Sequence, residues 1–347
     1  MTIPVQNIYY LLCYAWNKLE VGQQVGIGVD SYSNIESLLT KVLLESTNLL
    51  IKRGLAQDYI EIENELAGIK GRIDFNISMR RQLFEQGRAY CRHDEFTADI
   101  LANQILKSTL LRLMRLDSLD KNQKLALRNL RLRLHHISDI ELQSGHFRQV
   151  RVHGQNSFYG FVLNVCELIF HSTAIHEKGT NRRFQDFLRD EKKMARLFEA
   201  FIRNFYRREQ SRYRSGADTI EWQFAADSKG DNGLFPMMKT DITLTTALEK
   251  KIIEVKFYPE ALVRNQFGSD RLRSSHLYQL FAYITNLSLD ISHPGNASCS
   301  GILLYPTVDN HIDEIYQLAN HTIRIYTLNL NQPWQGIRED LLGLIAQ

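Results

Sequence analysis

The residues best suited to chemistry lie in two neighbouring β-prone runs, Thr240–Thr246 and Lys251–Tyr258. A polar turn separates the runs, and this arrangement predicts a β-hairpin. Because strand side chains alternate between two faces, Glu254 and Lys256 share one face of the second run, and Asp241 lies near the start of the first. An acid on one strand is therefore expected to face a Glu-x-Lys pattern on its neighbour.

Such a layout is typical of a site in which two carboxylates hold a divalent cation beside an ammonium group. Mg²⁺ takes hard oxygen ligands, usually one or two carboxylates, and leaves its other positions to water and phosphate. In this hypothesis Asp241 and Glu254 bind the cation, while Lys256 orients a water molecule or neutralises charge in the transition state. The alternative is a solvated sheet face, on which the same residues make only weak cross-strand ion pairs.

Two predicted helices flank these strands and carry further polar candidates. In the upstream helix, Glu191–Gln210, apolar residues recur at helical spacing, and Glu199 lies beside that stripe, where it can point back toward the site. The downstream helix, His276–Asn286, places Gln279 and Tyr283 one turn apart on one face. Taken alone, that pair is more typical of a half-buried helix edge than of a site.

The order of these features resembles that of the PD-(D/E)xK nucleases of the RecB-like branch. The proline that usually precedes the aspartate is replaced here by Thr240, which is tolerable because the proline is not a ligand. The whole chain is also similar to the McrC family, the nuclease subunits of McrBC restriction systems, which often have Asp-Ala-Lys where this chain has Glu-Val-Lys. The stretches that carry this resemblance are Ile3–Trp16, Gly68–Ile73, Leu101–Leu110, Thr240–Thr243 and Leu277–Leu280.

The resemblance implies a magnesium-dependent DNA endonuclease that acts as one subunit of a GTP-dependent, modified-cytosine-specific restriction complex in antiviral defence. It also implies an McrB-like AAA+ GTPase ring as partner, which the N-terminal part of the chain docks on and stimulates, and double-stranded DNA with modified cytosine as target. The site then consists of Asp241, Glu254 and the carbonyl of Val255 as metal ligands, with Lys256, Gln279, Tyr283 and Glu199 as further catalytic residues. The alternative is a catalytically silent assembly or activator subunit of the same ring, and the intact Asp, Glu and Lys argue against it.

The composition is that of an ordinary globular protein: 44% of the 347 residues are hydrophobic, 23% are charged, and the formal net charge is +3. This charge neither requires nor excludes nucleic acid. The four cysteines show no C-x-x-C spacing, which argues against a zinc site and a disulfide framework and fits a reducing compartment. The sequence shows no signal peptide, membrane span or P-loop motif. We therefore expect a cytoplasmic protein without membrane contact.

Basic residues gather in three places, and a run of charge is most often a solvated face. The second cluster directly follows the Glu-x-Lys strand in a predicted polar loop, which favours it as a phosphate contact. The third is a helix face, for which a solvated surface is favoured over a contact with DNA or an acidic partner. The clusters are Arg203, Arg207, Arg208, Arg212 and Arg214; Arg264, Arg271 and Arg273; and Lys121, Lys124, Arg128, Arg131 and Arg133. His276 is a minor site candidate because it opens the Gln-x-x-x-Tyr helix.

The pattern of elements predicts an α+β protein. The resemblance implies an N-terminal mixed helix/strand partner-docking domain at 1–157 and a PD-(D/E)xK restriction-endonuclease-like domain at 158–347. The elements around the hairpin predict a mixed sheet flanked by helices for the latter. Polar turns at 154–157 and 178–181 are the two candidate places for the boundary. Predicted helices are 4–19, Asn34–Arg53, Phe96–Met114, Lys121–Leu134, Phe158–His171 and a terminal helix ending at Ala346, and further strands are Ile60–Leu66, Ser298–Tyr305 and His321–Leu330. The glycines of Gly68–Phe75 indicate a turn or bulge between strands.

Overall fold

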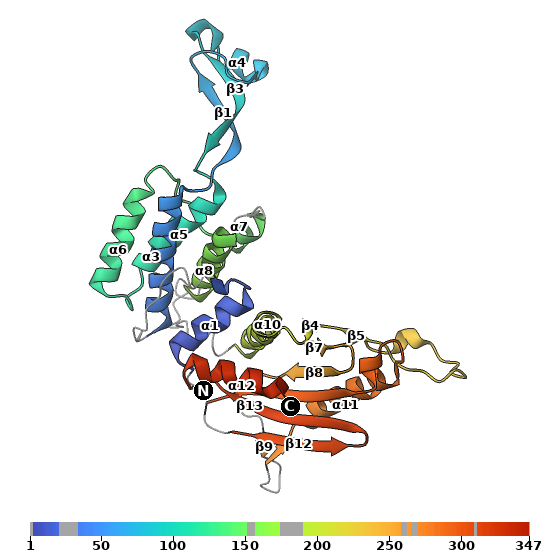
Figure 1. Cartoon of the computed structure of the whole chain (residues 1–347). Helices are drawn as coiled ribbons and strands as arrows, with labels where there is room; N and C mark the ends of the chain where they lie inside the picture. Colours follow the sequence, from blue (N-terminus) through green and yellow to red (C-terminus); the bar gives the residue numbers. More distant parts are fainter. Residues whose placement is uncertain are drawn as a thin grey trace. The chain divides into compact units, whose positions relative to one another are not determined.

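The computed structural model forms two compact units. It describes residues 3–20, 34–150, 157–173, 190–257, 262–264, 270–308 and 311–346 (Figure 1). The unit with the central sheet, called the sheet unit below, comprises Met1–Gly22, Ser31–Ser33 and Phe184–Gln347. The other, called the helical unit, comprises Gln23–Asp30 and Asn34–Arg183.

The helical unit is built from amphipathic helices that bury their apolar stripes against one another. They are α3 (Ile35–Arg53), α5 (Leu101–Met114), α6 (Lys121–Arg133) and α8 (Ser157–Thr173), with the short α7 (Ser144–Gln149) against α5 and α8. As the sequence predicts, α3 begins after an Asn34 cap, whose side chain accepts a 2.8 Å hydrogen bond from the Ser37 N–H. The fully buried Leu43, Leu110 and Phe161 come from α3, α5 and α8.

A small antiparallel sheet follows α3 in the chain. It contains β1 (Asp58–Leu66), β2 (Arg72–Ile73) and β3 (Ala89–Thr97), in the order β1-β3-β2, with α4 (Phe75–Arg80) and the 3-10 turn η1 (Phe84–Gln86) between β2 and β3. Gly71, at φ +68°, lies in the predicted turn between strands, and a Cβ there would come within 2.4 Å of the Arg92 carbonyl oxygen. This close approach explains the glycine without a phosphate-binding loop.

One predicted helix starts too early. The sequence indicates a helix from Phe96 to Met114, but Phe96 belongs to β3, where it pairs with Tyr59 of β1 at a ring-centroid distance of 5.1 Å. The helix itself, α5, begins at Leu101. Cross-strand pairing of two aromatic side chains therefore outweighs the helical spacing at this end.

The sheet unit contains a mixed sheet, as predicted. In the described part of the chain it has six strands in the order β12-β13-β11-β8-β7-β4, with β8, β11 and β13 parallel and the outer pairs antiparallel. Their bounds are β4 (Arg214–Gly216), β7 (Ile242–Thr245), β8 (Lys250–Val255), β11 (Cys299–Thr307), β12 (Asp313–Leu318) and β13 (His321–Asn329). Short elements elsewhere in the unit are β5 (Thr219–Ile220), β6 (Met238–Lys239), β9 (Leu262–Arg264), β10 (Asp270–Leu272), η3 (Asn232–Leu234) and η4 (Pro294–Asn296).

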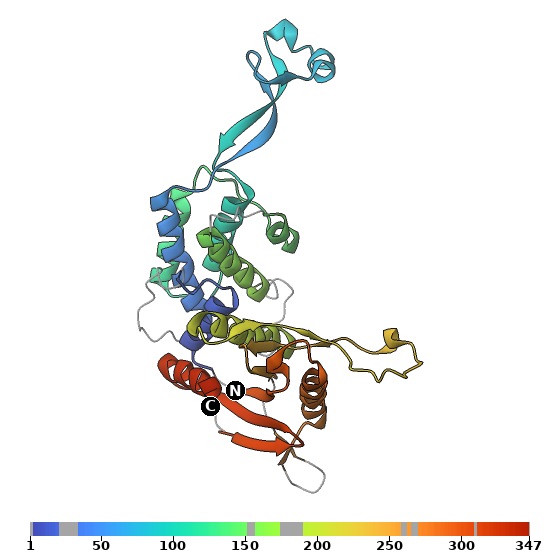
Figure 2. The same cartoon turned by 45° about the vertical axis from the view of Figure 1, so that its right-hand side comes forward.

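Helices cover both faces of this sheet (Figure 2). On one face α11 (Ser274–Leu289) packs against β8 and β11, where Ile252, Leu280 and Leu303 share a buried apolar cluster. On the other face lie α10 (Glu191–Glu209) and α12 (Trp334–Ala346), joined by a 2.8 Å hydrogen bond from the Tyr206 hydroxyl to the Leu341 carbonyl. This packing fixes the end of the sheet where β7 begins and β8 ends, and the polar residues of the hairpin gather there.

The two compact units do not coincide with the ranges expected from the sequence. The N-terminal helix α1 (Val5–Ala15) belongs to the sheet unit, because Tyr14 packs on Phe201 of α10 and its hydroxyl donates a 2.8 Å hydrogen bond to Glu209. Conversely, α8 belongs to the helical unit, where it packs against α3 and α5. Both assignments follow from apolar contacts between residues far apart in the chain, which local spacing does not reveal.

Two general features bear on the sequence-based expectations. In the part of the chain that the structure describes, no helix is both long and apolar enough to cross a membrane. The four cysteines are all buried and free, and burial raises the pKa of Cys13 and Cys166 to about 12. Buried thiols of this kind act as small apolar side chains.

Candidate active site

The register of the β7–β8 hairpin brings the two predicted acids together. Ile242 pairs with Ile253, so Asp241 and Glu254 occupy the next facing positions, where β7 begins. The Asp241 N–H donates to Oε1 of Glu254 at 3.3 Å, and the Val255 N–H donates to Oδ2 of Asp241 at 2.9 Å. The Asp241 side chain is therefore anchored on the neighbouring strand, as the hairpin prediction requires.

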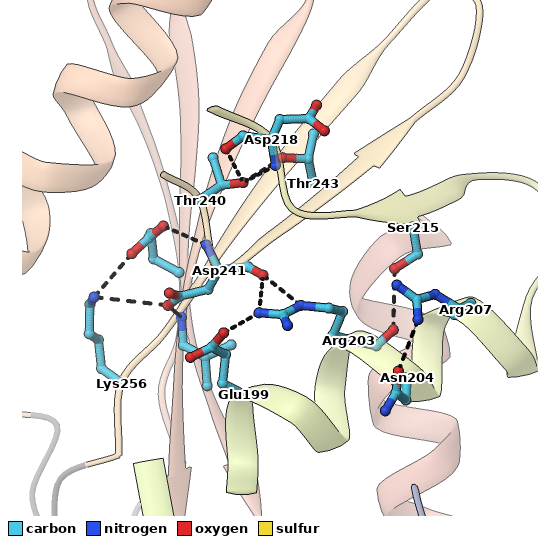
Figure 3. A network of polar contacts seen from close by, with 12 residues as sticks. Glu199, Arg203, Asn204, Arg207, Ser215, Asp218, Thr240, Asp241, Thr243 and Lys256 are labelled. Carbon is cyan, nitrogen blue, oxygen red and sulfur yellow. Dashed lines mark hydrogen bonds and ion pairs between the residues drawn. The ribbon is translucent and has the colours of Figure 1, made fainter. Parts of the chain in front are cut away.

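A chain of polar contacts connects these acids to α11. Nζ of Lys256 lies 3.0 Å from Oε2 of Glu254 and 4.0 Å from Oδ2 of Asp241 (Figure 3). It also donates to Oε1 of Gln279 at 3.0 Å, and Nε2 of Gln279 donates to the Tyr283 hydroxyl at 3.0 Å. The structure thus brings five of the predicted site residues into one network, and Gln279 and Tyr283 fix the ammonium group through the i,i+4 spacing of the helix.

Burial separates this site from a solvated sheet face. Every residue of β8 is buried, and Glu254 has no exposed surface. Burial, together with the charge of Asp241, raises the pKa of Glu254 to about 7. Burial lowers the pKa of Lys256, but the charges of Glu254 and Asp241 outweigh that effect and raise it above its ordinary value. The alternative of weak, solvent-exposed ion pairs does not fit these residues.

Glu199 also reaches the site, from α10. Its carboxylate pairs with Arg203, one turn further along the same helix, and the Arg203 guanidinium also contacts the main chain of Asp241 (Figure 3). Burial and the charge of Asp241 raise the pKa of Glu199, and Arg203 opposes this rise. The structure therefore places Glu199 beside the hairpin, as predicted from its position next to the apolar stripe.

Thr240, the residue directly before Asp241, anchors the segment that enters the site. Its Oγ1 accepts a 2.9 Å hydrogen bond from the Asp218 N–H and lies 2.8 Å from Oγ1 of Thr243 (Figure 3). Its own N–H donates to the Asp218 carbonyl at 3.0 Å. Hydrogen bonds therefore restrain the backbone just before Asp241.

The three basic clusters differ in what their side chains contact. In the first, only Arg203 contacts a site residue in the described part of the chain, whereas Arg208 pairs with Glu20 and Arg212 with Glu249. In the second cluster, two arginines lie on the antiparallel pair β9–β10 rather than in the predicted loop, and their side chains fall outside the described residues. The third cluster stays a prediction as a binding face; two of its arginines bond within the helical unit, to Asp139 and Asn48.

His276 is buried beneath the site rather than open to it. Its Nδ1 lies 3.0 Å from the hydroxyl of the buried Tyr305. Burial lowers the pKa of His276 to about 4, and the charges of Lys256 and Arg273 act in the same direction. At neutral pH the ring is therefore uncharged and supports the first turn of α11.

The donor atoms at the hairpin suit a hard divalent cation. Among the described residues no group of three or more His, Cys, Asp or Glu side chains has a metal-binding arrangement. Magnesium does not need so many protein side chains, because it usually binds one or two carboxylates and keeps several waters. Asp241 and Glu254 supply two such carboxylates, and burial together with the charge of Asp241 raises the pKa of Glu254, an effect that a bound cation would oppose.

Fold and site together define a class: a mixed sheet flanked by helices, with two carboxylates and a lysine on its hairpin and a Gln–Tyr pair on the adjoining helix. A family model described as "McrBC 5-methylcytosine restriction system component" matches residues 9–306. The chain is 32% identical over 346 residues to the "Type IV methyl-directed restriction enzyme EcoKMcrBC" of Escherichia coli (strain K12), covering 99% of this chain and 98% of that relative. This protein therefore belongs to the McrBC restriction-system family, which confirms the resemblance to McrC.

A solved structure supports the fold. The chain resembles, with a TM-score of 0.53 and 14% sequence identity, a chain of the refined half-complex from a tetradecameric assembly of Thermococcus gammatolerans McrB AAA+ hexamers with bound McrC. The match covers 98% of this chain and 77% of that one. At this identity the comparison bears on the fold alone.

Sequence reasoning missed two residues of this site. Arg203 is visible in the sequence only as part of a charge cluster, although its i,i+4 spacing from Glu199 indicates a pair on one helix face. Thr240 is visible only as a missing proline. Each of them also bonds to a main-chain group distant in the chain, and no local pattern identifies such a contact.

Proposed function

We propose that this protein is the nuclease subunit of a McrBC-type complex: a magnesium-dependent endonuclease that hydrolyses phosphodiester bonds in double-stranded DNA containing modified cytosine. The observation that carries the proposal is the Asp241–Glu254–Lys256 cluster, in which Glu254 is fully buried, Asp241 and Lys256 are partly buried, and the ammonium lies within 4.0 Å of both acids. A core does not need charged groups in this arrangement, and removing them from water is costly. Their retention supports a chemical role.

Each side chain has a definite task in the proposed reaction. Asp241 and Glu254, with the Val255 carbonyl, would hold the cation, which when bound polarises a phosphate and lowers the pKa of water. Lys256, kept charged by the neighbouring acids, neutralises the negative charge that develops on the phosphate. Gln279 and Tyr283 hold Lys256 in place, and Glu199 adds a further acid beside Asp241.

We further propose that the chain acts with an McrB-like AAA+ GTPase ring, which supplies the GTP hydrolysis and which this chain stimulates. Membership of the family supports this partner, and the sequence has no P-loop of its own. Because such a complex restricts DNA inside the cell, we place the protein in the cytoplasm. The rival proposal is a silent assembly subunit that stimulates the ring but cuts nothing; the cluster described above favours the nuclease.

A cleavage assay tests the proposal. The purified chain, its ring partner, GTP and Mg²⁺ are incubated with methylated and unmethylated DNA, and Asp241→Asn is compared with Asp227→Asn, an exposed acid outside the site. We expect the parent and Asp227→Asn to cut methylated DNA and Asp241→Asn to cut at least about a hundredfold more slowly, equivalent to about 3 kcal/mol of barrier. Stimulated GTP hydrolysis without any cleavage by the parent would instead support the silent subunit.

A further inference from the structure

Arg203 joins α10 to the main chain of the hairpin at Asp241. Its Nε and Nη2 donate to the Asp241 carbonyl at 3.1 and 3.0 Å, and Nη2 also pairs with the Glu199 carboxylate (Figure 3). The side chain is largely shielded, with 27% of its surface exposed. One guanidinium group therefore binds both a carbonyl next to β7 and a carboxylate on α10.

The contacts around Asp241 make this link unusual. Its N–H donates to Glu254, its Oδ2 accepts from the Val255 N–H, and its carbonyl accepts from Arg203. In these contacts, the N–H, the carbonyl and Oδ2 of Asp241 each form a hydrogen bond with the protein, and Oδ1 is the polar atom that takes no part. A planar guanidinium suits this role because its donors are rigidly spaced, whereas an ammonium is a point charge on a flexible stem.

We propose that Arg203 is a positioning residue for the cation site. It holds the Asp241 main chain and the Glu199 carboxylate in a fixed relation, so that the acids face one position, and its charge offsets their mutual repulsion. The inference rests on the proposed function, because it assumes that Asp241 binds a divalent cation. Outer contacts that orient a metal ligand typically change metal affinity by 10- to 100-fold when they are removed.

A purely structural role would give a different result. An arginine that only attaches α10 to β7 would lower the stability of the protein when it is replaced, without changing the affinity of the folded protein for a cation. The measurement must therefore report cation binding directly, on protein whose folding has been verified.

The experiment measures Mn²⁺ binding to the full-length chain by electron paramagnetic resonance, in which the free ion gives the signal. We expect Arg203→Ala to bind Mn²⁺ about 10- to 100-fold more weakly than the parent and Arg203→Lys to fall between them. Arg207→Ala is the matched control, because Arg207 lies one turn further along α10, is exposed, and contacts only Asn204 among the interactions found in the described residues. It should bind like the parent. Raising the Mg²⁺ concentration should restore cleavage by Arg203→Ala at least in part.

The outcomes separate the two proposals. If Asp241→Asn weakens Mn²⁺ binding but folded Arg203→Ala binds like the parent, the positioning role is wrong and the cation site stands. If the parent binds Mn²⁺ no better than Asp241→Asn, both are wrong. Should Arg203→Ala not fold, Arg203→Lys decides: it retains a cation but not the fork, so parent-like affinity in that variant overturns the inference and weaker affinity supports it.

Discussion

The main-chain N–H of Asp241 lies 3.3 Å from Oε1 of Glu254, so a backbone hydrogen bond connects two acids whose charges repel each other. The contact lowers the pKa of Glu254 slightly, but burial and the charge of Asp241 dominate and raise it to about 7. Glu254 is fully buried, so water does not screen this repulsion. The consequence is a site that favours a proton, or a cation, on the acids.

Glu254→Gln should therefore stabilise the cation-free protein, and the gain should grow with pH. In the parent, the folded state binds more protons than the unfolded state between the ordinary pKa of 4.5 and about 7, so the free energy of unfolding falls as pH rises through this window. Glutamine has no such titration. We expect a difference near zero below pH 4.5 that rises to the order of 3 kcal/mol above pH 7.

Urea unfolding with a chelator present, at several pH values between 4 and 8, measures this difference. Glu339→Gln, which changes an exposed acid on α12, serves as the control and should show little pH-dependent gain. A Glu254→Gln gain that is constant across the range would show that the pKa of Glu254 is not raised.

In the cleavage assay, Glu254→Gln should lose nearly all activity, while Glu254→Asp should retain measurable activity because it keeps the negative charge.

Lys256→Met should destabilise the protein strongly. The substitution leaves Glu254 and Asp241 without the ammonium that lies 3.0 and 4.0 Å away, and breaking a buried ion pair by removing one partner costs about 3 to 5 kcal/mol. The double variant Glu254→Gln/Lys256→Met should recover much of this loss, because the buried charge is gone. A Lys256→Met variant whose unfolding free energy at pH 8 lies within about 0.5 kcal/mol of the parent would behave like a surface substitution and contradict the described burial.

The sequence predicts the relative positions of these residues better than their environment. Period-two alternation correctly places Asp241 opposite a Glu-x-Lys face, and helical spacing correctly places Gln279 one turn from Tyr283. From the sequence alone, however, Glu254 looks like a surface charge whose replacement changes stability little. Its burial arises because α11 covers that face of β8, and such packing between distant segments is not encoded in local spacing.

The same limit explains the errors in the fold. The sequence does not reveal β12, because all of its residues are exposed and its alternation is weak. The domain ranges fail to anticipate α1, whose apolar stripe predicts a helix but not its packing partner, α10. Elements defined by their own periodicity are predicted well, whereas pairing and packing between distant elements are not.

Thr240→Val tests whether the hydroxyl of Thr240 stabilises the segment before Asp241. Valine has nearly the same shape but removes the hydroxyl that bonds to the Asp218 N–H and Thr243, leaving those groups without a partner. We expect a loss of about 1 to 3 kcal/mol in unfolding free energy, measured by urea titration. Thr240→Ser keeps the hydroxyl and should lose less. Equal losses in the two variants would assign the effect to the methyl group instead.

The last prediction concerns the fragment that acts on the partner ring. A fragment ending near residue 155 follows from the sequence-based boundary, but it lacks α8, whose Phe161 and Cys166 are fully buried in the helical unit. Without α8, the apolar faces of α3 and α5 would be open to water, so we expect fragment 1–155 to unfold without cooperativity. Fragment 34–183 contains the main helices of the unit and should melt cooperatively, as followed by circular dichroism.

If this unit is the part that docks on an McrB-like ring, fragment 34–183 should stimulate GTP hydrolysis by the ring and fragment 1–155 should not. A folded fragment 34–183 that leaves the GTPase rate unchanged would show that docking needs the sheet unit as well.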